Sequence, residues 1–196
     1  MGEQTFPVFL KLEGRKVLLV GGGAVASARA RDLVQAGALV TVVALEVRPA
    51  ILALSGVIVA QREFVPRDLD GVWFAVAAAT PEVNRRVADL AAERRIFINA
   101  VDDADRATAY MGGVFRRGGI TVAISTDGQA PALAGLLREG LEALVPDDID
   151  AWVRTGRDVR QAQRAAGVPM TERRPLLLRS LNRLYEASSI AVEADA

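Results

Sequence analysis

Short apolar runs alternate with longer segments of helical periodicity in the first half of the chain. The runs predict strands at 17–20, 39–43, 58–60, 72–77 and 96–98, and the periodic segments predict helices at 24–36 and 81–94. The run at 72–77 is apolar throughout, which is typical of a strand buried on both faces. Strands that alternate with helices join through right-handed crossovers into a parallel sheet, so this part of the chain predicts an α/β, Rossmann-like domain.

The pattern changes after residue 103. Two short apolar runs at 114–116 and 120–125 flank a pair of glycines and predict a hairpin. A helix with one apolar stripe is predicted at 131–144, and the stripe consists of Leu133, Leu136, Leu137, Leu141 and Leu144. From 147 to 186 we expect helix with a break at 167–169, and the apolar segment 6–10 is expected to be an edge strand or a packing arm.

The turn between the first strand and the first helix has the spacing G-x-G-x-x-A, on Gly21, Gly23 and Ala26. Gly21 permits a sharp turn, Gly23 lets a diphosphate approach the backbone, and Ala26 lets the helix pack close to the strand. The free N–H groups at the helix start, near Ala24 and Val25, suit a pyrophosphate. The alternative is a glycine turn that packs a helix and binds no ligand.

Ligands of open parallel sheets bind beyond the carboxyl ends of the strands. Glu46 lies there, about 20 residues after the glycine turn, where an acid can bind the hydroxyls of a ribose. A glutamate would repel a 2′-phosphate and so favours NAD⁺ over NADP⁺, although Arg48 weakens that argument. The segment with Ala78 and Thr80 follows the fourth strand, and its small residues suit either a nearby nicotinamide or tight packing.

Polar residues follow the fifth strand and the hairpin. Asp102 and Asp103 are the paired carboxylates at a strand end, and a carboxylate can serve as general base; turn or helix-cap aspartates are the alternative. Ser125 and Thr126 precede the helix at 131–144 and suit either an anionic ligand or helix capping.

Composition narrows the chemistry. The 196 residues carry 24 basic and 24 acidic side chains, so bulk charge gives no support for a nucleic-acid partner. The chain contains no cysteine and no histidine, which excludes disulfides, thiol nucleophiles and histidine bases. No apolar run is long enough for a membrane span and no secretory signal pattern is present, so we expect a cytoplasmic protein.

Four motifs carry a resemblance to a known family. They are Phe6-Pro7-Val8-Phe9, GGGAVA at 21–26, N-x-V-D at 99–102, and ISTDGQAPALAGLLREGLEALVP at 124–146. With these motifs the chain resembles the precorrin-2 dehydrogenase family of sirohaem biosynthesis, which includes dehydrogenase/ferrochelatases and the N-terminal module of sirohaem synthase. The similarity runs from about Phe6 to Pro146.

The resemblance implies an oxidoreductase of porphyrin-type tetrapyrrole biosynthesis. Members oxidise precorrin-2 to sirohydrochlorin with NAD⁺, and some then act as ferrochelatases by inserting Fe²⁺. The resemblance also implies a homodimer built from an NAD-binding Rossmann domain at 1–112, a dimerisation and tetrapyrrole-site region at 113–146, and a small helical C-terminal domain at 147–196.

The resemblance also implies roles for individual residues. Asp102 corresponds to the essential aspartate, which serves both activities and would be the metal-binding residue if the chain is a chelatase. The resemblance places Ala24 and Val25 at the pyrophosphate and Leu45 and Glu46 at the adenosine ribose. Together with Gly21, Gly23, Ala78 and Thr80, which the glycine spacing and the strand ends indicate, these are the expected cofactor-binding positions. Ser125 and Thr126 correspond to the hydroxyl pair of the tetrapyrrole site, and Asn99 at the end of the fifth strand is the third expected substrate-binding position.

Two segments depart from the family pattern. Residues 109–113 lack the usual proline, and the loop at 80–84 is about two residues short and lacks an acidic pair. Both border the expected tetrapyrrole pocket. Two other functions therefore stay open: a non-catalytic, NAD-binding regulatory Rossmann protein, and a tetrapyrrole-binding or chelatase protein without redox activity.

Overall fold

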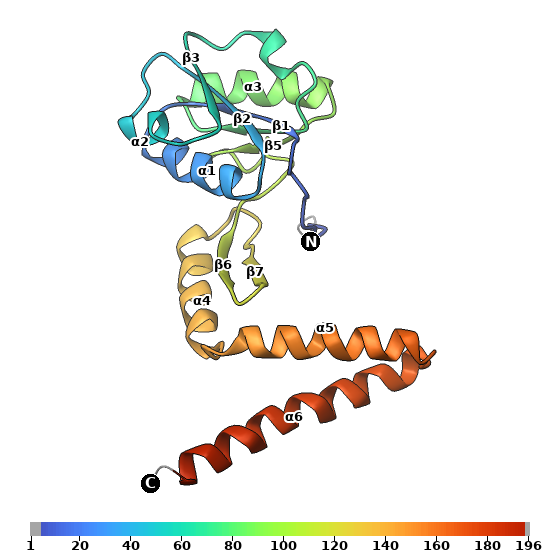
Figure 1. The fold of residues 1–196 in the computed structure, drawn as a ribbon. Coiled ribbons are helices and arrows are strands. Elements are labelled where there is room, and N and C mark those ends of the chain that lie inside the picture. The colour runs from blue at the N-terminus through green and yellow to red at the C-terminus, as the bar shows by residue number, and fades with distance from the viewer. Residues whose placement is uncertain (1–4, 195–196) are drawn as a thin grey trace. The chain divides into compact units, whose positions relative to one another are not determined.

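The computed structural model describes residues 5–194, with side chains described for 5–182. The chain forms two compact units. Unit 1 contains the chain up to Met111 together with Ser125–Pro131, and unit 2 contains Gly112–Ile124 and the chain from Ala132 onward. Each unit has its own secondary structure (Figure 1).

Unit 1 is built on a five-stranded parallel sheet in the order β3-β2-β1-β4-β5 (Figure 1). The strands are β1 (Lys16–Val20), β2 (Leu39–Ala44), β3 (Val57–Gln61), β4 (Phe74–Ala77) and β5 (Phe97–Ala100). The helices are α1 (Ala24–Gln35), the short α2 (Pro49–Leu52), the 3-10 helix η1 (Pro66–Leu69) and α3 (Pro81–Glu93). The strand order reverses between β1 and β4, so the predicted Rossmann-like fold is confirmed.

The core of unit 1 lies on both faces of this sheet. Along β4, Ala75 and Ala77 belong to one buried cluster, whereas Phe74 and Val76 belong to the other. The first cluster includes the α3 residues Val87, Ala88 and Ala91, and the second includes the α1 residues Ala26, Ala30 and Leu33. Burial of β4 on both faces explains its continuous apolar run.

A partly exposed ion pair holds the connection between β3 and β4. Arg62 donates two hydrogen bonds to the Asp68 carboxylate, from Nη1 at 2.8 Å and from Nη2 at 2.6 Å. The backbone N–H of Val65 donates a third to Asp68 Oδ2 at 2.9 Å. The Arg62 hydrogen bonds are the main reason why the pKa of Asp68 lies below its ordinary value.

Unit 2 contains an antiparallel hairpin and three helices (Figure 1). The elements are β6 (Gly113–Arg117), β7 (Ile120–Ile124), α4 (Pro131–Leu144), α5 (Ile149–Ala165) and α6 (Met170–Ala194). Arg117 ties the hairpin to the chain after α4, because its Nη1 donates to the carbonyl of Val145 at 2.6 Å. Helices α5 and α6 pack on each other, and the predicted break between them is confirmed.

Some predicted boundaries are wrong. Segment 6–10 forms no strand, because neither edge strand of the sheet pairs with it, and its side chains are exposed. Strand β4 begins at Phe74 rather than at 72, because the N–H of Val72 closes the turn after η1 by bonding to Leu69. Strand β5 extends through Asn99 to Ala100, which pairs with Ala77. Helix α2 and η1 are too short to show periodicity and were not predicted.

Candidate functional site

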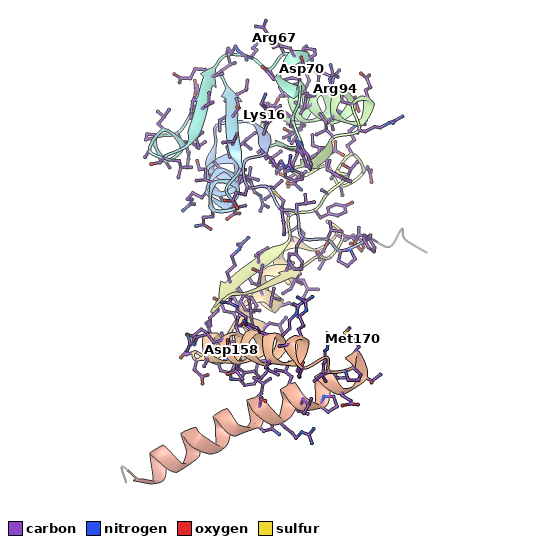
Figure 2. All side chains as sticks on the ribbon, turned by 45° about the vertical axis from the view of Figure 1, so that its right-hand side comes forward. Lys16, Arg67, Asp70, Arg94, Asp158 and Met170 are labelled. Atoms are coloured by element: carbon purple, nitrogen blue, oxygen red, sulfur yellow. The ribbon has the colours of Figure 1, made fainter. Side chains whose placement is uncertain are left out.

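The carboxyl ends of β1, β2, β4 and β5 meet at one edge of the sheet in unit 1. Figure 2 labels Lys16, which begins β1, and Arg94, which directly follows α3; both mark the opposite, amino-terminal edge. The loops after β1, β2, β4 and β5 therefore lie together at the carboxyl edge, where the strand order reverses. This is where open parallel sheets bind their ligands.

Two glycines allow the turn after β1 to pack closely against the loops that follow β2 and β4. Gly21 has φ +127°, and a Cβ there would lie 2.2 Å from the carbonyl oxygen of Ala78. A Cβ on Gly22 would lie 1.9 Å from the carbonyl oxygen of Glu46. Gly22 was missed as a site residue by the G-x-G-x-x-A spacing, and the third glycine of the run was the signal for it.

Gly23 has a different environment. It is exposed, it caps α1 with an ordinary φ of −81°, and a Cβ there would meet nothing within 4 Å. No side chain caps the helix, and Ala24 and Val25 beside it are exposed. Since the first N–H groups of a helix have no intrahelical partner, the start of α1 presents free donors beside an open space. The residues present fit a diphosphate.

The loop after β2 borders the same turn. The N–H of Arg48 donates to the carbonyl of Gly22 at 3.0 Å, which closes the contact between the two loops. Leu45 is 67% exposed, and the side chains of Glu46 and Arg48 are exposed. Among the described residues, Glu46 forms no ion pair and no side-chain hydrogen bond. Its carboxylate is available to ribose hydroxyls.

Asn84 connects the loops that follow β4 and β5. Its side chain is buried; Oδ1 accepts from the N–H of Ala79 at 2.8 Å and Nδ2 donates to the carbonyl of Val101 at 3.2 Å. Thr80 caps α3 by accepting from the N–H of Val83. Asn84 was missed by the sequence reasoning, although it lies three and four residues before the buried Val87 and Ala88.

The two neighbouring aspartates have different environments. Asp103 accepts from the N–H of Arg106 at 3.3 Å and forms an ion pair with its guanidinium at 3.5 Å. Asp102 is exposed, has φ +59°, and forms no ion pair or side-chain hydrogen bond among the described residues. Asp103 is the turn-stabilising aspartate of the pair, and Asp102 is the one whose carboxylate is free to react.

Asp102 lines a small pocket of about 240 Å³ at this edge. Its other lining residues come from the β4–α3 loop, the first turns of α3 and the segment after β5: Ala79, Pro81, Asn84, Arg85, Val101, Asp103 and Arg106. The lining therefore combines apolar residues with the unpaired Asp102 and two arginines.

The segment 109–111 is held from two elements. Asn99 on β5 donates from Nδ2 to the carbonyl of Ala109 at 3.0 Å, and Arg29 on α1 donates to the carbonyl of Met111 at 3.3 Å. Asn99 Oδ1 and Arg29 Nε are buried, and neither has a hydrogen-bond partner within the described part of the chain. Asn99 thus fixes the segment in which this chain lacks the usual proline.

The turn at 125–128 packs on the loop that follows Asp102. A Cβ on Gly128 would lie 3.0 Å from the ring of Tyr110 and 3.1 Å from Cβ of Ala104. The hydroxyl of Ser125 accepts from the N–H of Asp127 at 3.0 Å, and the hydroxyl of Thr126 accepts from the N–H of Ala130 at 3.1 Å. Both hydroxyls accept hydrogen bonds from the backbone of the turn itself, before α4 begins at Pro131.

The described residues contain no group of three or more acidic side chains arranged to hold a metal ion. Within the same part of the chain, none of the helices has the length and apolar character needed to cross a bilayer.

Family models match most of the chain. Residues 8–113 match the family described as "Putative NAD(P)-binding", which covers more than half of the chain, and residues 117–144 match the one described as "Sirohaem biosynthesis protein central". The chain belongs to the precorrin-2 dehydrogenase family of sirohaem biosynthesis. The predicted Rossmann-like fold and the expected family are thereby confirmed.

Named members of the family include longer proteins. The chain is 43% identical over 196 residues to siroheme synthase 3 of Aeromonas hydrophila subsp. hydrophila and 40% identical over 204 residues to siroheme synthase 2 of Yersinia pseudotuberculosis serotype I. Each alignment covers 97% of this chain but 42% of the relative, so the chain spans less than half the length of these relatives.

A solved structure of the family has a similar size. SirC, a precorrin-2 dehydrogenase, superposes with a TM-score of 0.70 at 28% sequence identity, and the match covers 89% of this chain and 88% of SirC. The family likeness therefore extends beyond the parallel sheet of unit 1.

Proposed function

We propose that the chain oxidises precorrin-2 to sirohydrochlorin with NAD⁺. The observation that carries this proposal is the pairing, at one sheet edge, of the open glycine turn at Gly23 with the free carboxylate of Asp102. The similarity to SirC over 89% of the chain supports the same reaction.

The backbone N–H groups of Ala24 and Val25 hold the cofactor diphosphate in this proposal, beside Gly21 and Gly23. Leu45 and Glu46 lie at the adenosine ribose, and Ala78 and Thr80 border the nicotinamide half. The bound cofactor supplies a hydride acceptor. NAD⁺ is preferred over NADP⁺ because the unpaired carboxylate of Glu46 would repel a 2′-phosphate.

Asp102 is the general base of the proposed reaction. Oxidation removes one hydride and one proton from precorrin-2, and a carboxylate oxygen of Asp102 takes the proton. Two observations support this assignment: Asp102 is exposed and lines the pocket, and Asp103 forms an ion pair with Arg106. Asn99, Ser125 and Thr126 are proposed to contribute to the tetrapyrrole site, Asn99 by fixing the 109–111 segment.

Anaerobic incubation of the purified chain with precorrin-2 and NAD⁺ tests the proposal. We expect NADH absorbance to rise as the sirohydrochlorin spectrum appears, and the dissociation constant for NAD⁺ to be lower than that for NADP⁺. A chain that binds NAD⁺ but leaves precorrin-2 unchanged would instead be a non-catalytic, regulatory dinucleotide-binding protein. Tighter binding of NADP⁺ would contradict the role given to Glu46.

Ferrochelation is the second activity considered. The chain has no histidine or cysteine, and by the family resemblance Asp102 is the residue that would contact Fe²⁺ as a substrate. Incubation of sirohydrochlorin with Fe²⁺ in the absence of NAD⁺ separates this activity from oxidation. Formation of the sirohaem spectrum would establish it, and its absence would restrict the chain to the dehydrogenase step.

We further propose a cytoplasmic homodimer with the domain roles 1–112 for NAD, 113–146 for dimerisation and the tetrapyrrole, and 147–196 as a helical domain. The leucine stripe of α4 supports dimerisation, because Leu136 is 67% and Leu144 is 78% exposed. Sedimentation of the wild type and of a Leu136→Glu, Leu144→Glu variant tests this. A dimer that dissociates in the variant is expected, and a monomeric wild type would contradict the proposal.

A further inference from the structure

The pocket beside Asp102 is too small for a whole tetrapyrrole. Sites that enclose drug-sized ligands measure about 300–1,000 Å³, whereas this pocket measures about 240 Å³. A macrocycle larger than a typical drug would have to lie outside it, with only a side arm inside. The arms of precorrin-2 end in carboxylates, so the chemistry of the lining determines whether such an arm fits.

The charges in the lining are not equivalent. Arg106 is already compensated by Asp103 at 3.5 Å and by Asp89 at 3.4 Å. Arg85 also lines the pocket, but it forms no ion pair or side-chain hydrogen bond among the described residues. Arg85 and Asp102 therefore line the same cavity, and neither pairs with the other or with another group among the described residues.

We infer that the pocket is a subsite for one carboxylate arm of the tetrapyrrole, bound by Arg85. A guanidinium presents several donors in a planar fork and matches a carboxylate, so Arg85 is suited to this role. An arm held there would bring the attached ring carbon to the pocket mouth, next to Asp102. Because Arg85 does not neutralise Asp102, the base stays free to accept a proton. This inference rests on the proposed function.

A buried side chain ties the loops that line the pocket together. Asn84 bonds to the backbones of Ala79 and Val101, which both belong to the lining. Pro81, in the first turn of α3, also lines the pocket. Shape and charge together favour a short carboxylate arm over an uncharged one.

Arg86 provides a matched control for Arg85. It is the next residue of α3, it is also exposed, and it does not line the pocket; its guanidinium lies 5.9 Å from the ring centroid of Phe64. Arg85→Gln and Arg86→Gln remove the same charge from the same helix. Arg85→Lys retains the charge but removes the planar fork.

The experiment compares these variants with the wild type in two measurements: steady-state oxidation of precorrin-2 and equilibrium binding of sirohydrochlorin by absorbance titration. We expect Arg85→Gln to raise KM and the sirohydrochlorin dissociation constant about tenfold to a hundredfold, the scale of a lost hydrogen bond to a charged group. Arg86→Gln should stay within about twofold of wild type, and Arg85→Lys should be intermediate. The NAD⁺ dissociation constant should be unchanged in all three variants.

The outcomes separate the two proposals. A wild type that oxidises precorrin-2, with Arg85→Gln and Arg86→Gln equal in both measurements, overturns the subsite and leaves the proposed function intact. A wild type that neither oxidises precorrin-2 nor binds sirohydrochlorin overturns both. Thermal melting of each variant identifies any loss of folding, and higher ionic strength should weaken sirohydrochlorin binding more in the wild type than in Arg85→Gln.

Discussion

The two sides of the candidate site are constructed differently. On the β1–β2 side, the contacts are made by main-chain atoms, at Gly21, Gly22 and the Arg48 N–H. The Glu46 side chain there has no hydrogen-bond or ion-pair partner among the described residues. On the β4–β5 side, side chains make the contacts: Asn84 joins two loops and Asp103 holds Arg106. The first side presents backbone donors, and the second presents side-chain chemistry.

This difference predicts different responses to mutation. A site made of main-chain groups changes when a side chain intrudes on it, whereas a site made of side chains changes when one is removed. Substitutions on the β1–β2 side should therefore affect cofactor affinity or folding, and those on the β4–β5 side should affect turnover. The following predictions test this contrast, from the largest expected effect to the smallest.

Asp102→Asn should lower kcat for precorrin-2 oxidation about a hundredfold or more, because the amide cannot accept the proton. Asparagine tolerates the positive φ at this position, so folding should be retained. Steady-state kinetics and NAD⁺ titration measure the two effects. The control is Asp103→Asn, for which a much smaller loss of kcat is expected. Normal turnover by Asp102→Asn would exclude it as the base.

Gly22→Ala and Gly23→Ala should differ although they are neighbours. A Cβ at 22 would lie 1.9 Å from the Glu46 carbonyl oxygen, so Gly22→Ala should destabilise the fold by about 3 kcal/mol. A Cβ at 23 meets open space, so Gly23→Ala should change stability by about 1 kcal/mol or less. Gly23→Ala should nevertheless weaken NAD⁺ binding about tenfold, because the methyl group occupies the space proposed for the diphosphate.

Denaturant unfolding and NAD⁺ titration on both variants check this pair. Equal destabilisation by the two substitutions would show that the turn has no open side. Unchanged NAD⁺ affinity in Gly23→Ala would contradict the proposal that the diphosphate binds at the start of α1.

Asn84→Leu should destabilise the protein by about 2 kcal/mol, since it leaves the Ala79 N–H and the Val101 carbonyl without their partner. It should also lower kcat, because the loop that carries Asp102 loses its attachment. Thr80→Ala, which removes an exposed cap, is the control and should cost less. Equal losses from both substitutions would contradict the role given to Asn84.

The Arg62–Asp68 pair predicts a small pH dependence of the free energy of unfolding. Because the pKa of Asp68 is lowered in the folded protein, its contribution to stability is present above its ordinary pKa of about 4 and is lost as pH falls through the folded-state value. Asp68→Asn should cost about 1 kcal/mol at neutral pH and should flatten the stability curve below about pH 4. Urea unfolding of the wild type and of Asp68→Asn at several pH values from about 3 to about 7 measures this dependence. Parallel curves of stability against pH for the two proteins would contradict the assignment.

The sequence was sufficient for the elements whose periodicity is long or whose burial is complete. It identified the five strands, α1, α3, α4 and the glycine turn, because apolar positions and glycines report directly on packing. It misjudged segment 6–10, since a strand requires a partner that a local pattern does not reveal. In the site, the spacing alone could not divide the roles of Asp102 and Asp103, because that depends on which carboxylate reaches Arg106; only the N-x-V-D motif at 99–102 singled out Asp102.

Asn84 shows what a closer inspection of the pattern would have found. It shares the buried face of α3 with Val87, Ala88 and Ala91, at a spacing of three, four and seven residues. A polar residue in such a row is unusual unless it is hydrogen-bonded. The signal for a buried asparagine was therefore present, but its partners in the neighbouring loops were visible only in three dimensions.

The close approach of Gly22 to the Glu46 carbonyl has a consequence for redesign. The contact that fixes this loop involves main-chain atoms alone, so the identity of the side chain at position 46 is uncoupled from the loop's shape. Exchanging Glu46 for a neutral or basic residue should alter the discrimination between phosphorylated and unphosphorylated dinucleotides while the scaffold stays as it is. With the role proposed for Glu46, cofactor preference would thus be adjustable without a change in the loop that carries it.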